Sequence, residues 1–191
     1  MKKTNTFKQA LSHLVVHFVA CLFIFLVMMP IIGGASSNTT LSVILGIVMA
    51  LIYAYFMFST SYECAAKDHK PYSETTPYPF KGLVLSLGVI VPVIITWIFY
   101  VIAWKAAPIP ETVDAQTSIP VITFTANMVY SFFTSPFWNF VAVKGSTANL
   151  AGQLVSLAVP AAACFAGYYL GYIKFDYTKY INKIVYDKKK K

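Results

Sequence analysis

The stretch Pro120–Lys144, PVITFTANMVYSFFTSPFWNFVAVK, decides how many times this chain crosses a membrane. It is apolar enough to enter a bilayer, but Ser135 and Pro136 interrupt it. Neutral polar residues recur in it at helical spacing, namely Thr123, Asn127, Ser131 and Ser135. Whether this stretch crosses or stays at one face fixes the side on which the following residues emerge.

The composition places the whole chain in a membrane. Of its 191 residues, 58% are hydrophobic and only 12% are charged, whereas soluble domains have roughly 25% charged residues. Such a chain is predicted to be an all-α integral membrane protein that forms one membrane domain over residues 1–191. It has no room for a separate soluble domain beside its spans.

Four apolar runs are predicted to span the membrane, at about 11–32, 41–58, 83–104 and 150–173. They contain no acidic or basic residue, so we expect no proton relay and no ion-driven transport through buried carboxylates. The first run is also compatible with a cleaved signal ending near Gly33–Ala35, but its length favours a retained anchor. The connections are an inner loop at 61–80, an outer segment at 105–149 and a basic cytoplasmic tail at 174–191.

The lysines decide the topology, because all 15 basic residues are lysines. If residues 121–143 do not cross, 13 lysines lie inside and two lie outside. If they do cross, seven lie inside and eight outside. Cytoplasmic segments carry the excess of Lys and Arg, so we predict four spans in the cell membrane with both termini in the cytoplasm.

Residues of about 121–135 are predicted to form an additional helix on the outer face. At 100° per residue its apolar and polar side chains separate onto two faces. This pattern is compatible with a helix lying in the interface and with a re-entrant helix that turns at Pro136. The uncharged face of Thr123, Asn127, Ser131 and Ser135 is interpreted as a polar path for a solute or as a surface that contacts protein.

Candidate metal ligands are weak. His13, His17 and Cys21 follow one another at four-residue spacing, which places them along one side of a helix. Glu63, Cys64, Asp68 and His69 are expected near the same cytoplasmic level. Paired zinc signatures are absent, so we predict no metal, no cofactor and no catalytic residue, with His13, His17, Cys21 and His69 as the remaining metal candidates.

Small residues in the last span are predicted to allow close helix packing, either within the chain or between chains. They are Gly152, Ser156, Gly167 and Gly171. Beyond the bilayer itself, the expected partners are other membrane proteins and, at Lys188–Lys191, anionic lipid. No nucleic-acid partner is expected, because the positive charge follows membrane orientation.

Function is not encoded in any local motif. The chain lacks a glycine-rich phosphate loop and a nucleophile elbow, so we expect a protein that is not an enzyme. The leading hypothesis is a non-catalytic subunit or scaffold of a membrane complex. The alternatives are a small facilitator or channel component that uses the polar stripe, and a membrane-bound metal or thiol enzyme. The lysine-only basic set and the many Ile, Tyr and Phe residues indicate an AT-rich bacterial genome.

The lysine distribution makes a direct prediction about the C-terminal side. A reporter enzyme fused after Lys191 should be active on the cytoplasmic side of the membrane, because that topology keeps 13 of the 15 lysines inside. Paired fusions of an alkaline phosphatase and a fluorescent protein would measure this. A signal from the outer side of the membrane would require residues 121–143 to cross.

Overall fold

The computed structural model describes residues 5–35, 39–70, 73, 75–106, 120–137 and 150–175. Every regular element in these ranges is helical: α1 (Thr6–Ala35), α2 (Thr39–Asp68), α3 (Lys81–Ala106), α4 (Val121–Phe133), the short 3₁₀ helix η1 (Ser135–Phe137) and α6 (Leu150–Tyr172). Among them α1, α2, α3 and α6 are long and apolar enough to cross a membrane. The predicted all-helical class with four such helices is therefore confirmed, and it indicates a multi-pass membrane protein.

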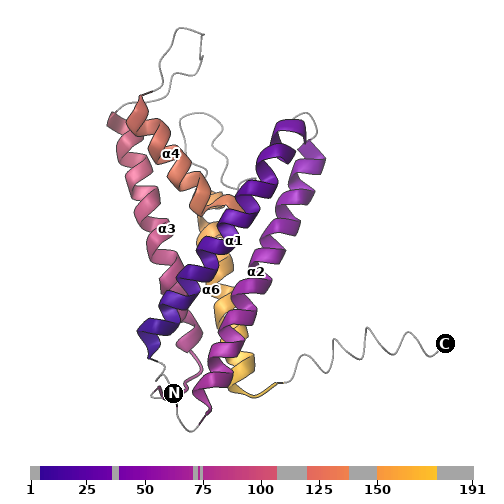
Figure 1. Ribbon diagram of the computed structural model, residues 1–191, viewed down its shortest axis with the longest axis vertical. Helices are drawn as coiled ribbons and strands as arrows, with labels where there is room; N and C mark the ends of the chain where they lie inside the picture. The colour runs from indigo at the N-terminus through magenta and orange to yellow at the C-terminus, as the bar shows by residue number, and fades with distance from the viewer. Residues whose placement is uncertain are drawn as a thin grey trace, which may run out of the picture.

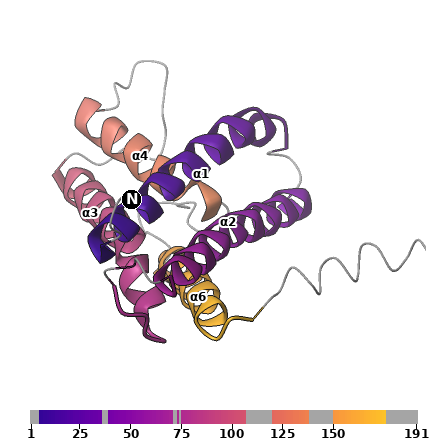
Figure 2. The ribbon, with the colours of Figure 1, turned by 60° about the horizontal axis from the view of Figure 1, so that its bottom comes forward.

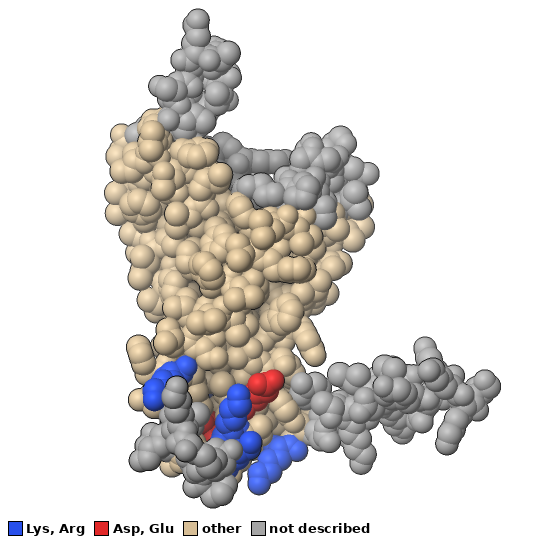
Figure 3. Space-filling view, in the orientation of Figure 1, with Lys and Arg blue, Asp and Glu red and all other residues tan. Residues whose placement is uncertain are grey.

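Four helix ends gather at one end of the bundle, the lower end in Figure 1. They are the start of α1, the end of α2, the start of α3 and the end of α6. The described lysines concentrate there too, as the blue atoms in Figure 3 show. We call this the lysine-rich end and define it by Lys8, Lys67, Lys70, Lys81 and Lys174.

Three helices extend further than hydropathy predicts. The inner loop was expected from residue 61, but α2 continues to Asp68, and α3 already begins at Lys81. Likewise α1 reaches Ala35, through the residues expected to begin a turn. Hydropathy detects the apolar middle of a helix, whereas the backbone stays helical through polar residues that find partners on neighbouring helices.

Small residues bring α6 and α2 into close contact within the chain. A Cβ added to Gly167 would collide with the carbonyl oxygen of Phe58, and one added to Gly171 would meet the Cβ of Ala65 at 2.7 Å. Gly152 and Ser156, further up α6, are also buried. Gly167 and Gly171 thus pack against α2 of the same chain, whereas packing by Gly152 and Ser156 stays a prediction.

The end of α6 closes in a left-handed turn. Lys174 has φ 56°, and the amides of Lys174 and Phe175 return to the carbonyls of Gly171 and Leu170 at 3.1 and 2.9 Å. This pair of bonds is the Schellman motif, in which glycine usually takes the left-handed position. The hydroxyl of Tyr62 on α2 donates to the carbonyl of Phe175 at 3.0 Å, so the turn is also tied to the neighbouring helix.

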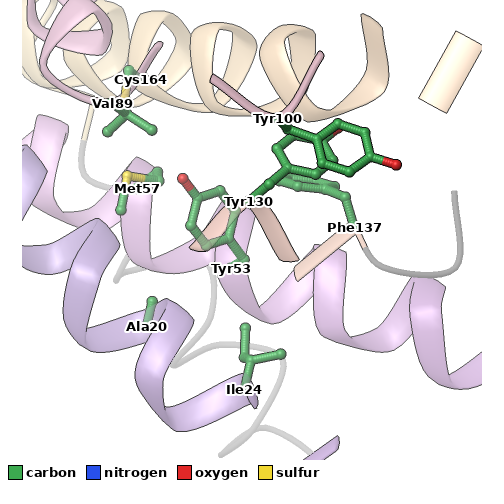
Figure 4. Packing of buried hydrophobic residues seen from close by; sticks show 9 residues of the cluster. All are labelled: Ala20, Ile24, Tyr53, Met57, Val89, Tyr100, Tyr130, Phe137 and Cys164. Carbon is green, nitrogen blue, oxygen red and sulfur yellow. The ribbon is translucent and has the colours of Figure 1, made fainter. Parts of the chain in front are cut away.

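The hydrophobic core lies where the helices cross, and aromatic rings fill much of it (Figure 4). Tyr100 of α3 and Tyr130 of α4 stack with ring centroids 5.1 Å apart, and Tyr53 of α2 meets Phe137 of η1 edge to face at 5.3 Å. The outward surface of the long helices is equally apolar: Leu51 and Ile95, for example, are 64% and 60% exposed. Such a surface is typical of helices that face lipid.

The α4 helix descends from the far end of α3 toward the middle of the bundle (Figure 1). Pro120 precedes its first turn, and Thr134 ends it with a backbone bond back to Tyr130. The chain then enters η1, whose three residues are buried against α1, α2 and α6. Figure 2 shows α4 beside α3, on the other side of α1 from α2.

The glycine contact predicts a selective loss of stability. Replacing Gly167 with Ala should lower the free energy of unfolding by about 1–3 kcal/mol, because the new methyl group overpacks the α2–α6 contact. The exposed neighbour Ala166 offers a matched control, and Ala166→Val should change stability by less than about 0.5 kcal/mol. Detergent-induced unfolding followed by circular dichroism would measure both. Equal effects of the two changes would contradict the close contact.

Candidate functional site

A column of buried polar side chains follows one side of α1. Gln9, His13, His17 and Cys21 succeed one another every four residues, so they lie above one another on the helix. They are 0–4% exposed and extend over about 18 Å at 1.5 Å per residue. Together with their partners Tyr53, Ser61 and Asp68 on α2, we call them the polar column.

The lower end of the column is the carboxylate of Asp68, the last residue of α2. Its Oδ2 accepts bonds from the ammonium of Lys81 at 2.5 Å and the hydroxyl of Tyr168 at 2.7 Å. Its Oδ1 accepts bonds from the amide of Gln9 and the hydroxyl of Thr75, both at 2.6 Å. The Asp68 and Lys81 side chains are fully buried, so this ion pair is shielded from solvent.

Asp68 also fixes the orientation of the Gln9 amide. A carboxylate only accepts hydrogen bonds, so the amide nitrogen of Gln9 must face it. The amide oxygen of Gln9 then points elsewhere and has no partner among the described residues. The donors to Asp68 come from α1, α3, α6 and the segment before α3, so one side chain joins all these parts of the chain.

His13 occupies the next level of the column and uses both ring nitrogens. Its Nδ1 lies 2.8 Å from the carbonyl oxygen of Gln9, and its Nε2 lies 2.7 Å from the hydroxyl of Ser61. A carbonyl can only accept, so the neutral ring carries its proton on Nδ1 and accepts the Ser61 proton at Nε2. The ring is thereby fixed between α1 and α2.

His17 and Cys21 form the upper levels. Nδ1 of His17 lies 2.7 Å from the hydroxyl of Tyr53. The sulfur of Cys21 lies 3.6 Å from His17 Nε2 and 3.6 Å from the carbonyl oxygen of Phe133 at the end of α4. Ser135 of η1 donates to the carbonyl of Cys21 at 3.0 Å. The column therefore ends where α4 and η1 meet α1.

The polar stripe of α4 turns toward the bundle. Thr123 is buried and donates to the carbonyl of Ala103 on α3 at 3.2 Å, and Ser131 and Ser135 are also buried. Asn127 is half-buried. The opposite face is exposed, with Val121 at 80% and Phe124 at 47%. The stripe thus contacts protein of this chain along three of its four positions.

Tyr130, on the buried side of α4, differs from these groups in its hydrogen bonding. Its hydroxyl is buried and has no hydrogen-bond partner among the described residues. Its ring is held by stacking on Tyr100.

The metal candidates do not converge. Within the part of the chain that the structure describes, no three His, Cys, Asp or Glu side chains are placed to hold a metal ion. His69 bonds instead to the carbonyl of Tyr172 at 2.9 Å. Two nitrogens of His13 and one of His17 are engaged in bonds to α1 and α2. The four terminal lysines expected to bind anionic lipid lie outside the described residues.

The sequence reasoning missed the buried ion pair. It placed Asp68 in the inner loop and Lys81 between that loop and the third span, and it expected no charged group inside the bundle, whereas both side chains are fully buried. The signal was present as spacing: Tyr53, Ser61 and Asp68 are separated by eight and seven residues, which keeps them on one face of a helix. Gln9 similarly precedes His13 by one turn.

No protein-family model, curated protein or solved structure matches this chain. What the polar column does must therefore be inferred from its own chemistry.

The polar column predicts that the hydroxyl of Ser61 contributes more to stability than the hydroxyl of its neighbour Thr60. Ser61→Ala should cost about 1–3 kcal/mol of unfolding free energy, because it leaves the buried Nε2 of His13 without a partner. Thr60 is the matched control, since its hydroxyl bonds to the carbonyl of Phe56, one turn earlier on the same helix. Thr60→Ala should stay within about 0.5 kcal/mol. SDS-induced unfolding would measure the stability of both variants. Equal losses of stability would show that the bond between Ser61 and His13 does not stabilise the fold.

Proposed function

We propose that this protein is a non-catalytic subunit of a membrane complex, a scaffold that binds other membrane proteins through its outward helix surfaces. The observation that carries the proposal is the use made of its polar groups. The carboxylate of Asp68 accepts four bonds, and both nitrogens of His13 are engaged within the chain. Polar groups that are hydrogen-bonded to neighbouring helices hold those helices together and are not free to act on a substrate.

The surface supports the same proposal. The exposed side chains of the long helices are large and apolar, and they include Leu51, Ile95 and Ile102 at 60–64% exposure. In a bilayer such faces meet lipid or the helices of another protein. The close glycine contacts of α6 are already filled by α2, so a partner would meet these bulkier faces.

The proposed setting is the cell membrane of a bacterium, with four spans and both termini in the cytoplasm. Five of the six described lysines belong to the lysine-rich end, which suits the cytoplasmic side. On this orientation α4 starts at the outer side. Its inward polar face, its outward apolar face and the burial of η1 favour a re-entrant segment over one lying flat in the interface.

A second candidate function is a facilitator for a small uncharged solute. The polar column favours it, since the imidazole and thiol groups of α1 and the hydroxyls of α2 beside them follow one another over about 18 Å. The direct bonds between these groups favour the subunit instead, because a permeating solute would have to replace them.

Purification from native membranes in a mild detergent, with quantitative mass spectrometry, tests the proposal. A specific membrane protein should co-elute at a fixed stoichiometry. A photoreactive residue at the exposed position 51 or 95 should crosslink to it, because these side chains face outward. The same probe at the buried Met57 is the matched control and should not crosslink.

Two outcomes would contradict the subunit. If the protein elutes alone as a monomer and crosslinks only to lipid, it has no protein partner in the membrane. Solute flux through liposomes of the pure protein that falls with Ser61→Ala would transfer the function to the facilitator.

A further inference from the structure

We propose that Gln9, Asp68, Lys81 and Tyr168 form a latch that closes the polar column at the lysine-rich end of the bundle. Its release would separate the helix ends and admit water to the column. The latch does not depend on the proposed subunit function, since it concerns a conformational change within the chain.

The latch residues come from four helices whose ends gather at the lysine-rich end. Gln9 lies in the first turns of α1, Asp68 ends α2, Lys81 begins α3 and Tyr168 lies one turn before the end of α6. Each of the three partners bonds directly to the Asp68 carboxylate, at 2.5–2.7 Å. Asp68 is the acceptor that these three side chains share. Loss of its charge while Lys81 stays charged therefore disturbs the bonds of three helices at once.

The position of the latch makes it a closure for the column. Gln9 belongs to both, because its amide bonds to Asp68 and its carbonyl accepts the His13 bond. Beyond His13 the polar side chains continue through Ser61, His17 and Tyr53. Asp68 and Lys81 thus stand between these groups and the end of the bundle, and both are fully buried.

Closure of the column depends on the presence of both opposite charges, on Asp68 and on Lys81. Two buried opposite charges satisfy each other, but a single buried charge left without its partner is strongly unfavourable. At a helix end, the response with the smallest free-energy cost is for water to enter and hydrate that charge. Changing one partner should therefore open the end, whereas removing both charges together should largely restore closure.

Native cysteines report such opening. All three described cysteines are unpaired and buried. Cys164 lies one turn before Tyr168, and its carbonyl oxygen packs against Gly82 beside Lys81. Cys21 lies at the other end of the column, about 18 Å along α1 from Gln9. Opening at the latch should expose Cys164 and leave Cys21 protected, whereas general unfolding would expose both.

The experiment measures labelling of the full chain in nanodiscs by a charged, water-soluble methanethiosulfonate, in variants that retain only Cys164 or only Cys21. Asp68→Asn and Lys81→Met should each speed labelling of Cys164 by about a hundredfold or more, with Cys21 unchanged. The double variant Asp68→Asn/Lys81→Met should return most of the way to the original rate. Tyr168→Phe removes one bond to a charged group and should give about tenfold.

Glu63 and Lys67 provide the matched control. They form an ion pair on the same helix at 3.6 Å, but both side chains are more than half exposed. Glu63→Gln should leave the labelling rate unchanged. The latch is overturned if Tyr168→Phe labels at the original rate, if the double variant labels as fast as the single variants, or if Cys21 is exposed together with Cys164. Tyr168→Phe keeps the test decisive if the charge variants fail to fold.

Discussion

The carboxylate of Asp68 constrains the lysine-rich end of this bundle more than any other described group. An ionised carboxylate removed from water costs several kcal/mol unless donors replace its hydration. Asp68 obtains four donors, and three of them belong to other helices. Their geometry can be satisfied together only when the starts of α1 and α3 and the end of α6 lie at one level around the last turn of α2. The register of the helices is thereby specified at this end.

The packing of the other parts of the bundle reflects how few forces can hold helices together in a membrane. Lipid tails are as apolar as the helix surfaces, so apolar burial alone does not hold helices together in a membrane. This chain uses the two remaining means. The polar column joins α1 to α2 by bonds at 2.6–2.7 Å, and glycines let α6 approach the backbone of α2. Each means is directional, so each selects one pairing of helices.

The same reasoning accounts for α4. Its hydroxyls at Thr123 and Ser131 lie on the side of the bundle, where Thr123 donates to the carbonyl of Ala103. Apolar side chains such as Val121 and Phe124 need no partner and face outward. A soluble amphipathic helix would be arranged the other way round, with apolar residues inside. The orientation of α4 thus agrees with an apolar environment around the bundle.

The class, the four long helices and the amphipathic segment after Pro120 were predictable from the sequence, because hydropathy and helical spacing are local properties. The i, i+4 series of His13, His17 and Cys21 was predictable for the same reason, but its use was not. Whether a polar residue finds a partner depends on the helix that lies beside it. Asp68 and Lys81 therefore looked like loop residues, although they are 13 positions apart and fully buried against each other. Composition and spacing determined which segments are helices and which faces are polar. Only the tertiary structure decided which polar faces meet, because hydrogen bonds and ion pairs depend on distances between residues that are remote in the chain.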